Sequence, residues 1–310
     1  MPDSPAAREL GWVRMRRLVI TAAAAVAAAG LAACGSISSG STPSGSSGGS
    51  SGGGSTGSTA SCSNASIQKD LFAKGKLTVA TDKPVYPPWF EGNNPANGKG
   101  YESAVAYAVA KQLGFKPSQV TWAYEPFNAS YAPGPKKFDF DINEVSYTPQ
   151  RATAVTFSNS YYQDNQALVA LKGTPIIAHH TPADLRKYVF GDQIGTTSLA
   201  FITSQIQPTS QPKVFSTLND VKSALQTHQI AALVADTPTA QFISSSEIPH
   251  SVTLGQFTSG SGHFGLLFHL GNPLVTCVNK ALSTLKSDGT LAALQKKWLQ
   301  LYIKIPTIQP

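Results

Sequence analysis

The sequence predicts an α/β fold with largely parallel sheets, and three observations support this prediction. Short β-like runs alternate with helical patterns from residue 62 onward. Hydrophobic residues make up 41% and charged residues 13% of the chain, as in soluble globular proteins, and 310 residues suffice for two domains. Strand-like runs occur at 76–81, 120–124, 138–142, 166–171, 188–194, 212–215 and 230–235, and helical periodicity at 101–113, 198–207, 218–227, 272–287 and 290–302.

Individual elements are justified by their residue pattern. The run 101–113 places Val105, Ala108 and Val109 on one helical face. The run "IAALVA" at 230–235 is continuously apolar, which is typical of a strand that is buried on both faces. These patterns indicate strands covered by helices.

The first 33 residues have the pattern of an export signal. Arg14, Arg16 and Arg17 precede an apolar run, 18–33, that is shorter than a full membrane span. The run ends in "LAACG", which resembles the lipobox of bacterial lipoproteins. This resemblance implies cleavage before Cys34, acylation of its sulfur, and a lipid anchor on the outer face of the bacterial cytoplasmic membrane. The alternative is a plain secretory signal with an incidental cysteine.

Residues 34–61 consist almost entirely of Gly, Ser and Thr after the cysteine. Such a segment has no apolar surface to bury, so we expect a flexible tether between the anchor and a folded body that begins at residue 62. The net charge of +7 is scattered along the chain rather than gathered into a block, which argues against nucleic-acid binding.

Two cysteines remain beyond the anchor. Export to an oxidising compartment favours a disulfide between Cys62 and Cys277, although two buried free thiols are the alternative. No CxxC motif or His/Cys cluster is present in the sequence, so we expect no metal.

Three predicted strand ends carry polar chemistry. The first is "FDFDINEVS", followed by Thr148-Pro149, a pair that favours a helix start. Arg151 then falls in the first turn, where free N–H groups and a guanidinium can bind a carboxylate. A solvated surface arginine is the alternative interpretation.

The other two strand ends complement the first. Gly195 and Thr197 follow a β-like run and can bind an anion, although helix capping by Thr197 also explains the pattern. Asp236 precedes Thr237-Pro238, which can cap and start a helix without it. Its carboxylate is therefore free for an ammonium group, or for a salt bridge to a lysine. Two anion-binding ends and one carboxylate match an amino-acid zwitterion.

The chain from 76 to 302 resembles the bacterial extracellular solute-binding proteins of amino-acid ABC importers, family 3. The resemblance is collinear and rests on "LTVATDKPVYPPWF", "GKGYESAVAYAVAKQLGF", "FDFDINEVSYTPQRATAVTFSNSYY", "ADLRKYVFGDQIGTTS" and "ALQTHQIAALVADTPTA". It implies a two-lobed type II periplasmic-binding (Venus-flytrap) fold, with two mixed sheets flanked by helices. The implied limits are 62–160 plus 266–310 for the first lobe, 166–260 for the second, and 161–165 and 261–265 for a two-strand hinge.

The resemblance also implies roles for individual residues. Arg151 and Ser146 hold the α-carboxylate of the ligand from the first lobe. Thr197 and the backbone near Gly195 hold it from the second lobe, and Asp236 binds the α-ammonium.

Further residues are implied to contact the ligand side chain. Tyr86 and Trp89 form its wall, and Asp82 lies near its end. Glu144 stands where the family more often has a small residue. Together with Asp82 it favours a cationic or amide side chain, unless it pairs with Lys83 or points away.

The resemblance implies the function of an importer component. The protein is expected to be a monomer that captures an amino acid, needs no cofactor, and docks on a membrane permease with its ATPase. Two alternatives remain. One is an enzyme similar to cyclohexadienyl dehydratases, with Glu144 as general acid or base. The other is a lipoprotein that senses a ligand without transporting it.

Overall fold

The computed structural model describes residues 62–308, without the side chains of 259–261. The predicted export signal (1–33), the acylated Cys34 and the tether (34–61) lie outside the described residues. Within the described part, no helix combines the length and apolar character that a membrane crossing requires.

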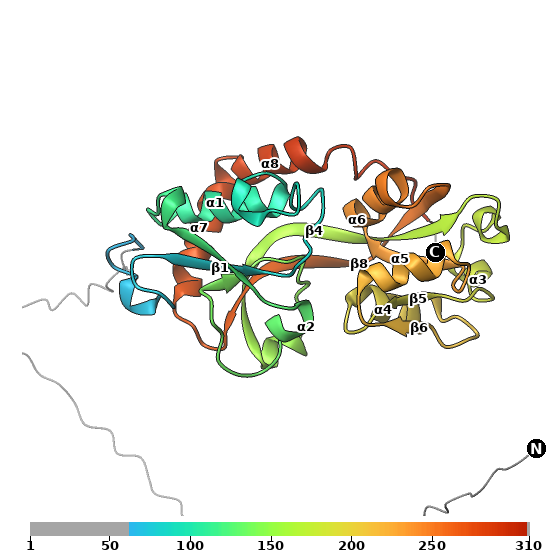
Figure 1. Ribbon diagram of the computed structural model, residues 1–310, viewed down its shortest axis with the longest axis horizontal. Helices are drawn as coiled ribbons and strands as arrows, with labels where there is room; N and C mark the ends of the chain where they lie inside the picture. The colour runs from blue at the N-terminus through green and yellow to red at the C-terminus, as the bar shows by residue number, and fades with distance from the viewer. Residues whose placement is uncertain (1–61, 309–310) are drawn as a thin grey trace, which may run out of the picture. The chain divides into compact units, whose positions relative to one another are not determined.

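A six-stranded mixed sheet forms the centre of the fold, in the order β2-β1-β3-β8-β4-β7 (Figure 1). β1 pairs in parallel with β2 and β3, whereas β8 is antiparallel to β3 and β4, and β4 is antiparallel to β7. The strands are β1 (Leu77–Thr81), β2 (Val120–Tyr124), β3 (Phe140–Asp141), β4 (Val155–Leu171), β7 (Ala232–Asp236) and β8 (Ser251–His269). A separate parallel pair is formed by β5 (Gly191–Gln193) and β6 (Lys213–Phe215).

β4 and β8 pass through both lobes and join them. They have 17 and 19 residues and pair from Val155–His269 at one end to Leu171–Ser251 at the other. Their register shifts between Ser160 and Tyr162 and again between Asp164 and Gln166. The two-lobed α/β fold is therefore confirmed, and the crossing consists of two continuous strands. The limits of the lobes and hinge stay a prediction.

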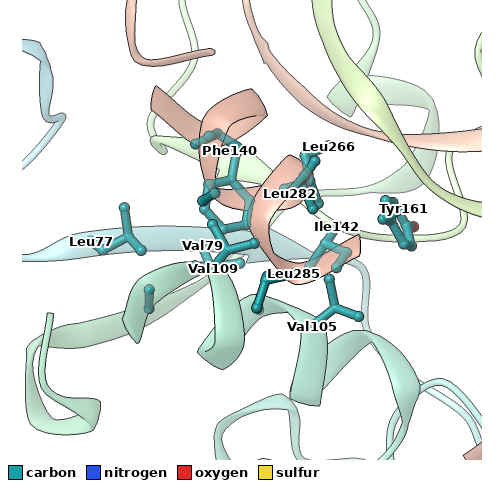
Figure 2. Packing of buried hydrophobic residues seen from close by; sticks show 14 of the residues in the cluster. Leu77, Val79, Val105, Val109, Phe140, Ile142, Tyr161, Leu266, Leu282 and Leu285 are labelled. Atoms are coloured by element: carbon teal, nitrogen blue, oxygen red, sulfur yellow. The ribbon is translucent and has the colours of Figure 1, made fainter. Parts of the chain in front are cut away.

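The first lobe packs helices on the sheet. These helices are α1 (Tyr101–Gln112), α7 (Leu274–Ser287) and α8 (Thr290–Leu299), with the short α2 (Phe127–Ser130) in a loop. Val105 and Val109 of α1 are spaced one turn apart and meet Val79 of β1 and Leu285 of α7 in a fully buried cluster (Figure 2). A disulfide joins Cys62 to Cys277 of α7, with a Cα–Cα distance of 5.2 Å, so that prediction is confirmed.

The second lobe buries both faces of β7. Leu233 and Ala235 pack in one apolar cluster with α5 (Leu218–Gln226), and Ala232 and Val234 pack in another on the side of α4 (Thr197–Phe201). This two-sided burial is the arrangement that the apolar run 230–235 predicts. The remaining helices of this lobe are α3 (Pro182–Leu185) and α6 (Thr237–Phe242).

Two predicted helix starts differ in the structure. Arg151 begins a single 3-10 turn, Arg151–Thr153, instead of an α-helix, because β4 follows directly at Val155. The predicted role of Thr148 holds locally, since its hydroxyl accepts the Arg151 N–H at 3.1 Å. Thr196, not Thr197, caps α4 by accepting the Leu199 N–H.

The start of α6 also differs from the prediction. Thr237 does not cap this helix, because its hydroxyl donates to the Asn165 carbonyl at 2.8 Å. Asp236 occupies the cap position but makes no side-chain capping bond. Its carboxylate is thus free of capping, as expected.

The end of the described chain packs on the second lobe, which differs from the expected extension of the first lobe to residue 310. The Gln256 N–H donates to the Pro306 carbonyl, and the Ile308 N–H donates to the Gln256 carbonyl, both at 2.8 Å. Ile308 is buried in the same cluster as Val234. Gly255 makes this packing possible, because a Cβ there would lie 2.7 Å from the Ile308 side chain.

Candidate functional site

A cavity of about 320 Å³ lies between residues of the two lobes. Its lining includes the loop after β1, the loop after β3, the start of α4 and the end of β7. Five of the nine predicted ligand-binding residues line it: Asp82, Tyr86, Glu144, Thr197 and Asp236. The other four, Arg151, Ser146, Gly195 and Trp89, are not among its lining residues.

Arg151 is buried, with 8% of its surface exposed, and it bridges the lobes. One guanidinium nitrogen donates to the Ser146 carbonyl at 2.7 Å and the other to the Gly195 carbonyl at 2.8 Å. The guanidinium carbon lies 4.4 Å from the centre of the Tyr131 ring, a cation–π distance. Burial lowers the pKa of Arg151, although Tyr131 and Asp236 act in the opposite direction.

Ser146 and Thr197 meet across the same boundary, with their hydroxyl oxygens 3.1 Å apart. Gly195 has φ +78°, and a Cβ at this position would overlap the Tyr131 hydroxyl and lie 2.7 Å from Asn128 Oδ1. Only glycine allows the backbone of the second lobe to approach this closely. The structure therefore brings together the four residues predicted to hold a carboxylate.

Asp236 lies in a hydrogen-bonded polar network. Gln166 donates from Nε2 to Asp236 Oδ1 at 2.6 Å, and the Ser198 hydroxyl donates to Gln166 Oε1 at 2.6 Å. Burial beside Asp236 raises the pKa of Asp164 well above its ordinary value, which favours a protonated Asp164 next to an ionised Asp236. Burial also raises the pKa of Asp236, while Asp164, Gln166 and Arg151 oppose that rise.

Trp89 and Glu144 meet at Thr239 of α6. Trp89 is 1% exposed, and its Nε1 donates to the Thr239 hydroxyl at 2.7 Å. Thr239 in turn donates to Glu144 Oε2 at 2.8 Å. The structure thus places Trp89 in the aromatic core with Tyr101 and not in the cavity wall. Its ring is positioned by packing, which the sequence alone did not reveal.

Asp82 and Tyr86 lie at another part of the lining. Asp82 accepts the Lys83 N–H at 2.6 Å, and burial raises the pKa of Asp82. The ammonium of Lys222 lies 4.4 Å from the centre of the Tyr86 ring and pairs with Glu247 at 2.8 Å. This is the only ion pair within the described chain, so neither Glu144 nor Asp82 pairs with Lys83.

Several residues at the site were missed by sequence reasoning. Phe127 lines the cavity, Tyr131 supports Arg151, Gln166 holds Asp236, and Thr239 holds Glu144. A polar Gln166 directly before a continuous apolar run was a usable signal for a buried polar role. Among the described residues, no group of three or more His, Cys, Asp or Glu side chains is arranged to hold a metal ion.

Two relatives that are similar over most of the chain are named for the amino acids they bind. A probable histidine-binding protein of Campylobacter jejuni is 28% identical over 231 residues, which are 72% of this chain and 84% of that protein. ABC transporter arginine-binding protein 1 of Escherichia coli is 27% identical over 221 residues, which are 69% of this chain and 86% of that protein.

Solved structures show the same fold. An ancestral arginine-binding protein bound to arginine matches with a TM-score of 0.61 and 26% identity, covering 73% of this chain and 98% of that one. An ancestral amino-acid-binding protein described as a precursor of cyclohexadienyl dehydratase matches with a TM-score of 0.61 and 25% identity, covering 76% and 98%. The model of one family matches residues 77–301. The chain belongs to the bacterial extracellular solute-binding proteins, family 3.

Proposed function

We propose that this protein captures an amino acid between its lobes and delivers it to the permease and ATPase of an ABC importer. One observation carries the proposal: Asp236 lines the cavity, Arg151 binds the Gly195 carbonyl beside the lining residue Thr196, and the two side chains form no ion pair in the described chain. A guanidinium next to the cavity and a carboxylate in its lining, not in contact with each other, leave room for a zwitterion. The family and the names of the relatives support the same function.

The lining favours a ligand with a polar or cationic side chain. Four acids and one base, Lys83, are among the described lining residues. The acids are Asp82, Glu144, Asp192 and Asp236. Asp192 is held structurally, because its oxygens accept the backbone N–H groups of Gln193 and Val234. Asp82 also accepts a backbone N–H, from Lys83, but it lines the cavity and is assigned to a cationic side chain, in keeping with relatives named for histidine and arginine.

Closure of the lobes is proposed to depend on the ligand. Arg151–Gly195, Ser146–Thr197 and Trp89–Thr239 are contacts between lobes, so they form only when the lobes close. Bending at 161–165 and 261–265 is the proposed motion. The proposed location is outside the cytoplasmic membrane, with a lipid on Cys34 and the tether connecting it to a monomeric body.

Isothermal titration of the mature protein against the twenty amino acids and cystine tests the proposal. The expected result is micromolar or tighter binding of at least one amino acid with a polar or cationic side chain. If none of these ligands binds, the assignment is refuted.

The enzyme alternative rests on Glu144, a buried carboxyl beside the cavity whose pKa burial raises well above its ordinary value. A raised pKa suits a general acid, and one structural relative is described as a precursor of cyclohexadienyl dehydratase. Our proposal expects no turnover. Incubation with prephenate and arogenate checks this, and product formation that disappears in Glu144→Gln would establish the enzyme instead.

A further inference from the structure

The backbone of Glu144 is held in an unusual conformation. Its φ is +53°, in the left-handed region that residues other than glycine rarely adopt. The Glu144 N–H donates to Glu102 Oε1 at 2.7 Å, and Glu102 is fully buried in the first turn of α1. The Tyr161 hydroxyl of β4 donates to the same oxygen. Two donors thus fix the Glu102 carboxylate, which in turn fixes the loop that carries Glu144.

The direction of the hydrogen bonds at Thr239 indicates the protonation state of the Glu144 carboxyl. An indole N–H can only donate, so the Thr239 hydroxyl accepts from Trp89 and directs its own proton toward Glu144 Oε2. This arrangement suits an ionised Glu144. Within the described chain no hydrogen bond is made to Oε1, and Glu144 lines the cavity.

Glu144 is linked to Asp236 by both contact and charge. Burial, followed by the charges of Glu102 and Asp236, raises the pKa of Glu144 well above its ordinary value. Thr239, which contacts Glu144, lies three residues after Asp236 on α6. The charged or titratable groups around this pair are Glu102 of α1, Asp164, Tyr161 and Tyr162 of β4, Asp192 of β5, and Arg151 before β4. Arg151 is the one cation among them.

We propose that Glu144 is the second carboxylate of the site that binds the ligand α-ammonium, beside Asp236, and that Glu102 and Tyr161 are positioning residues for it. This inference rests on the proposed function. Two enclosed carboxylates repel each other unless a proton or a cation lies between them. The ligand ammonium supplies that cation when the lobes close. Glu144 therefore contacts the α-ammonium, which all α-amino acids share, and not the ligand side chain.

Titration calorimetry with three probes tests the assignment: L-arginine, L-histidine and L-glutamine. Glu144→Gln should weaken the binding of every probe that wild type binds by a similar factor, about tenfold to a hundredfold, because it removes one charge-assisted contact to the common ammonium. Asp82→Asn is the matched control, since it should weaken arginine selectively. A loss confined to arginine in Glu144→Gln would overturn the assignment while leaving the proposed function in place. If wild type binds none of the three, Glu144→Gln is compared with wild type on an amino acid that binds in the screen of the twenty, and unchanged affinity there would overturn this inference alone.

The pH profile tests the positioning residues. Wild-type affinity should fall as pH is lowered from 7 to 5, because protonation of Glu144 competes with the ammonium, and Glu144→Gln should show a smaller slope. Glu102→Ala should reproduce that smaller slope, whereas Glu102→Gln, which keeps an acceptor for the Glu144 N–H, should retain more of the wild-type slope. Tyr161→Phe should weaken all bound probes by about threefold to tenfold, the effect of one hydrogen bond. A wild-type slope in both Glu144→Gln and Glu102→Ala would overturn the positioning role.

Discussion

The basic end of the proposed ligand site, at Arg151, and the acidic end, at Asp236 and Glu144, stabilise buried charge in opposite ways. At the basic end the single guanidinium of Arg151 is already satisfied by two backbone carbonyls and an aromatic ring. At the acidic end the charge of Asp236 raises the pKa of Glu144 further after burial, and neither carboxylate has a cationic partner within 4.0 Å among the described residues. The basic end is therefore complete without a ligand, whereas the acidic end lacks a positive charge. Carboxylate binding is therefore expected to depend on geometry, and ammonium binding on charge.

Removal of the basic end should have the largest effect. Arg151→Ala deletes the guanidinium and leaves the Ser146 and Gly195 carbonyls without their donor, so we expect ligand affinity to fall by about a hundredfold to a thousandfold. Calorimetry with the best-binding amino acid measures the loss. Arg151→Lys keeps the charge but loses the two-pronged geometry, and should recover only part of the affinity. Full recovery in Arg151→Lys would show that charge, not geometry, governs this end.

Neutralising the acidic end should have the next largest effect. Asp236→Asn keeps the size of the side chain but removes the charge, and we expect about tenfold to a hundredfold weaker binding of amino acids. The ligand-free protein should meanwhile become more stable to urea, because the repulsion between Asp236 and Glu144 is removed. A stability loss together with unchanged affinity would contradict the role given to charge at this end.

The backbone contact at Gly195 provides a smaller and purely geometric test of the basic end. Gly195→Ala adds a Cβ that would overlap the Tyr131 hydroxyl at φ +78°, so the Arg151–Gly195 contact must shift. We expect about tenfold weaker binding, with an unchanged dependence of affinity on pH. Gly271→Ala is the matched control, since it has φ +76° but nothing within 4 Å of the added atom. Equal affinity loss in both variants would assign the effect to backbone strain alone.

The sequence predicts those site residues that directly follow a β-like run, because their place at a strand end is visible in the sequence. Arg151 and Asp236 each follow a β-like run, and topology brings such ends together. Sequence reasoning missed Gln166 and Thr239, because their roles arise from partners 70 and 95 residues away in the chain. Trp89 was misplaced for a related reason, since a tryptophan after Pro-Pro can face a ligand or pack in a core, and only its tertiary neighbours decide.

Secondary structure was likewise predictable where the local sequence decides it and not where tertiary contacts do. The apolar run 230–235 was correctly interpreted as a doubly buried strand, because burial on both faces is visible in composition. The 17 residues of β4 were not predicted as one strand, since its polar middle, 163–166, resembles a loop. That polar middle exists because the strand passes between the lobes, where Asp164 and Gln166 serve the site.

The last expected effect concerns stability instead of affinity: the free energy of unfolding should depend on pH through a buried carboxyl next to the acidic end. Burial raises the pKa of Glu102 to about 7, above the value near 4.5 of an exposed glutamate, so the folded protein binds more protons than the unfolded chain between these values. The free energy of unfolding should therefore fall as pH rises from 5 to 8, by about 1–3 kcal/mol, since each unit of pKa difference corresponds to about 1.4 kcal/mol. Urea unfolding of the ligand-free protein at both pH values measures this. Glu102→Gln should reduce this dependence, although Asp139, whose pKa burial raises to about 6, still contributes. Arg151→Lys should leave the dependence unchanged, because neither cation titrates in this range. Stability that increases from pH 5 to 8 would show that the acidic end carries no excess of negative charge, and the contrast between the two ends would no longer hold.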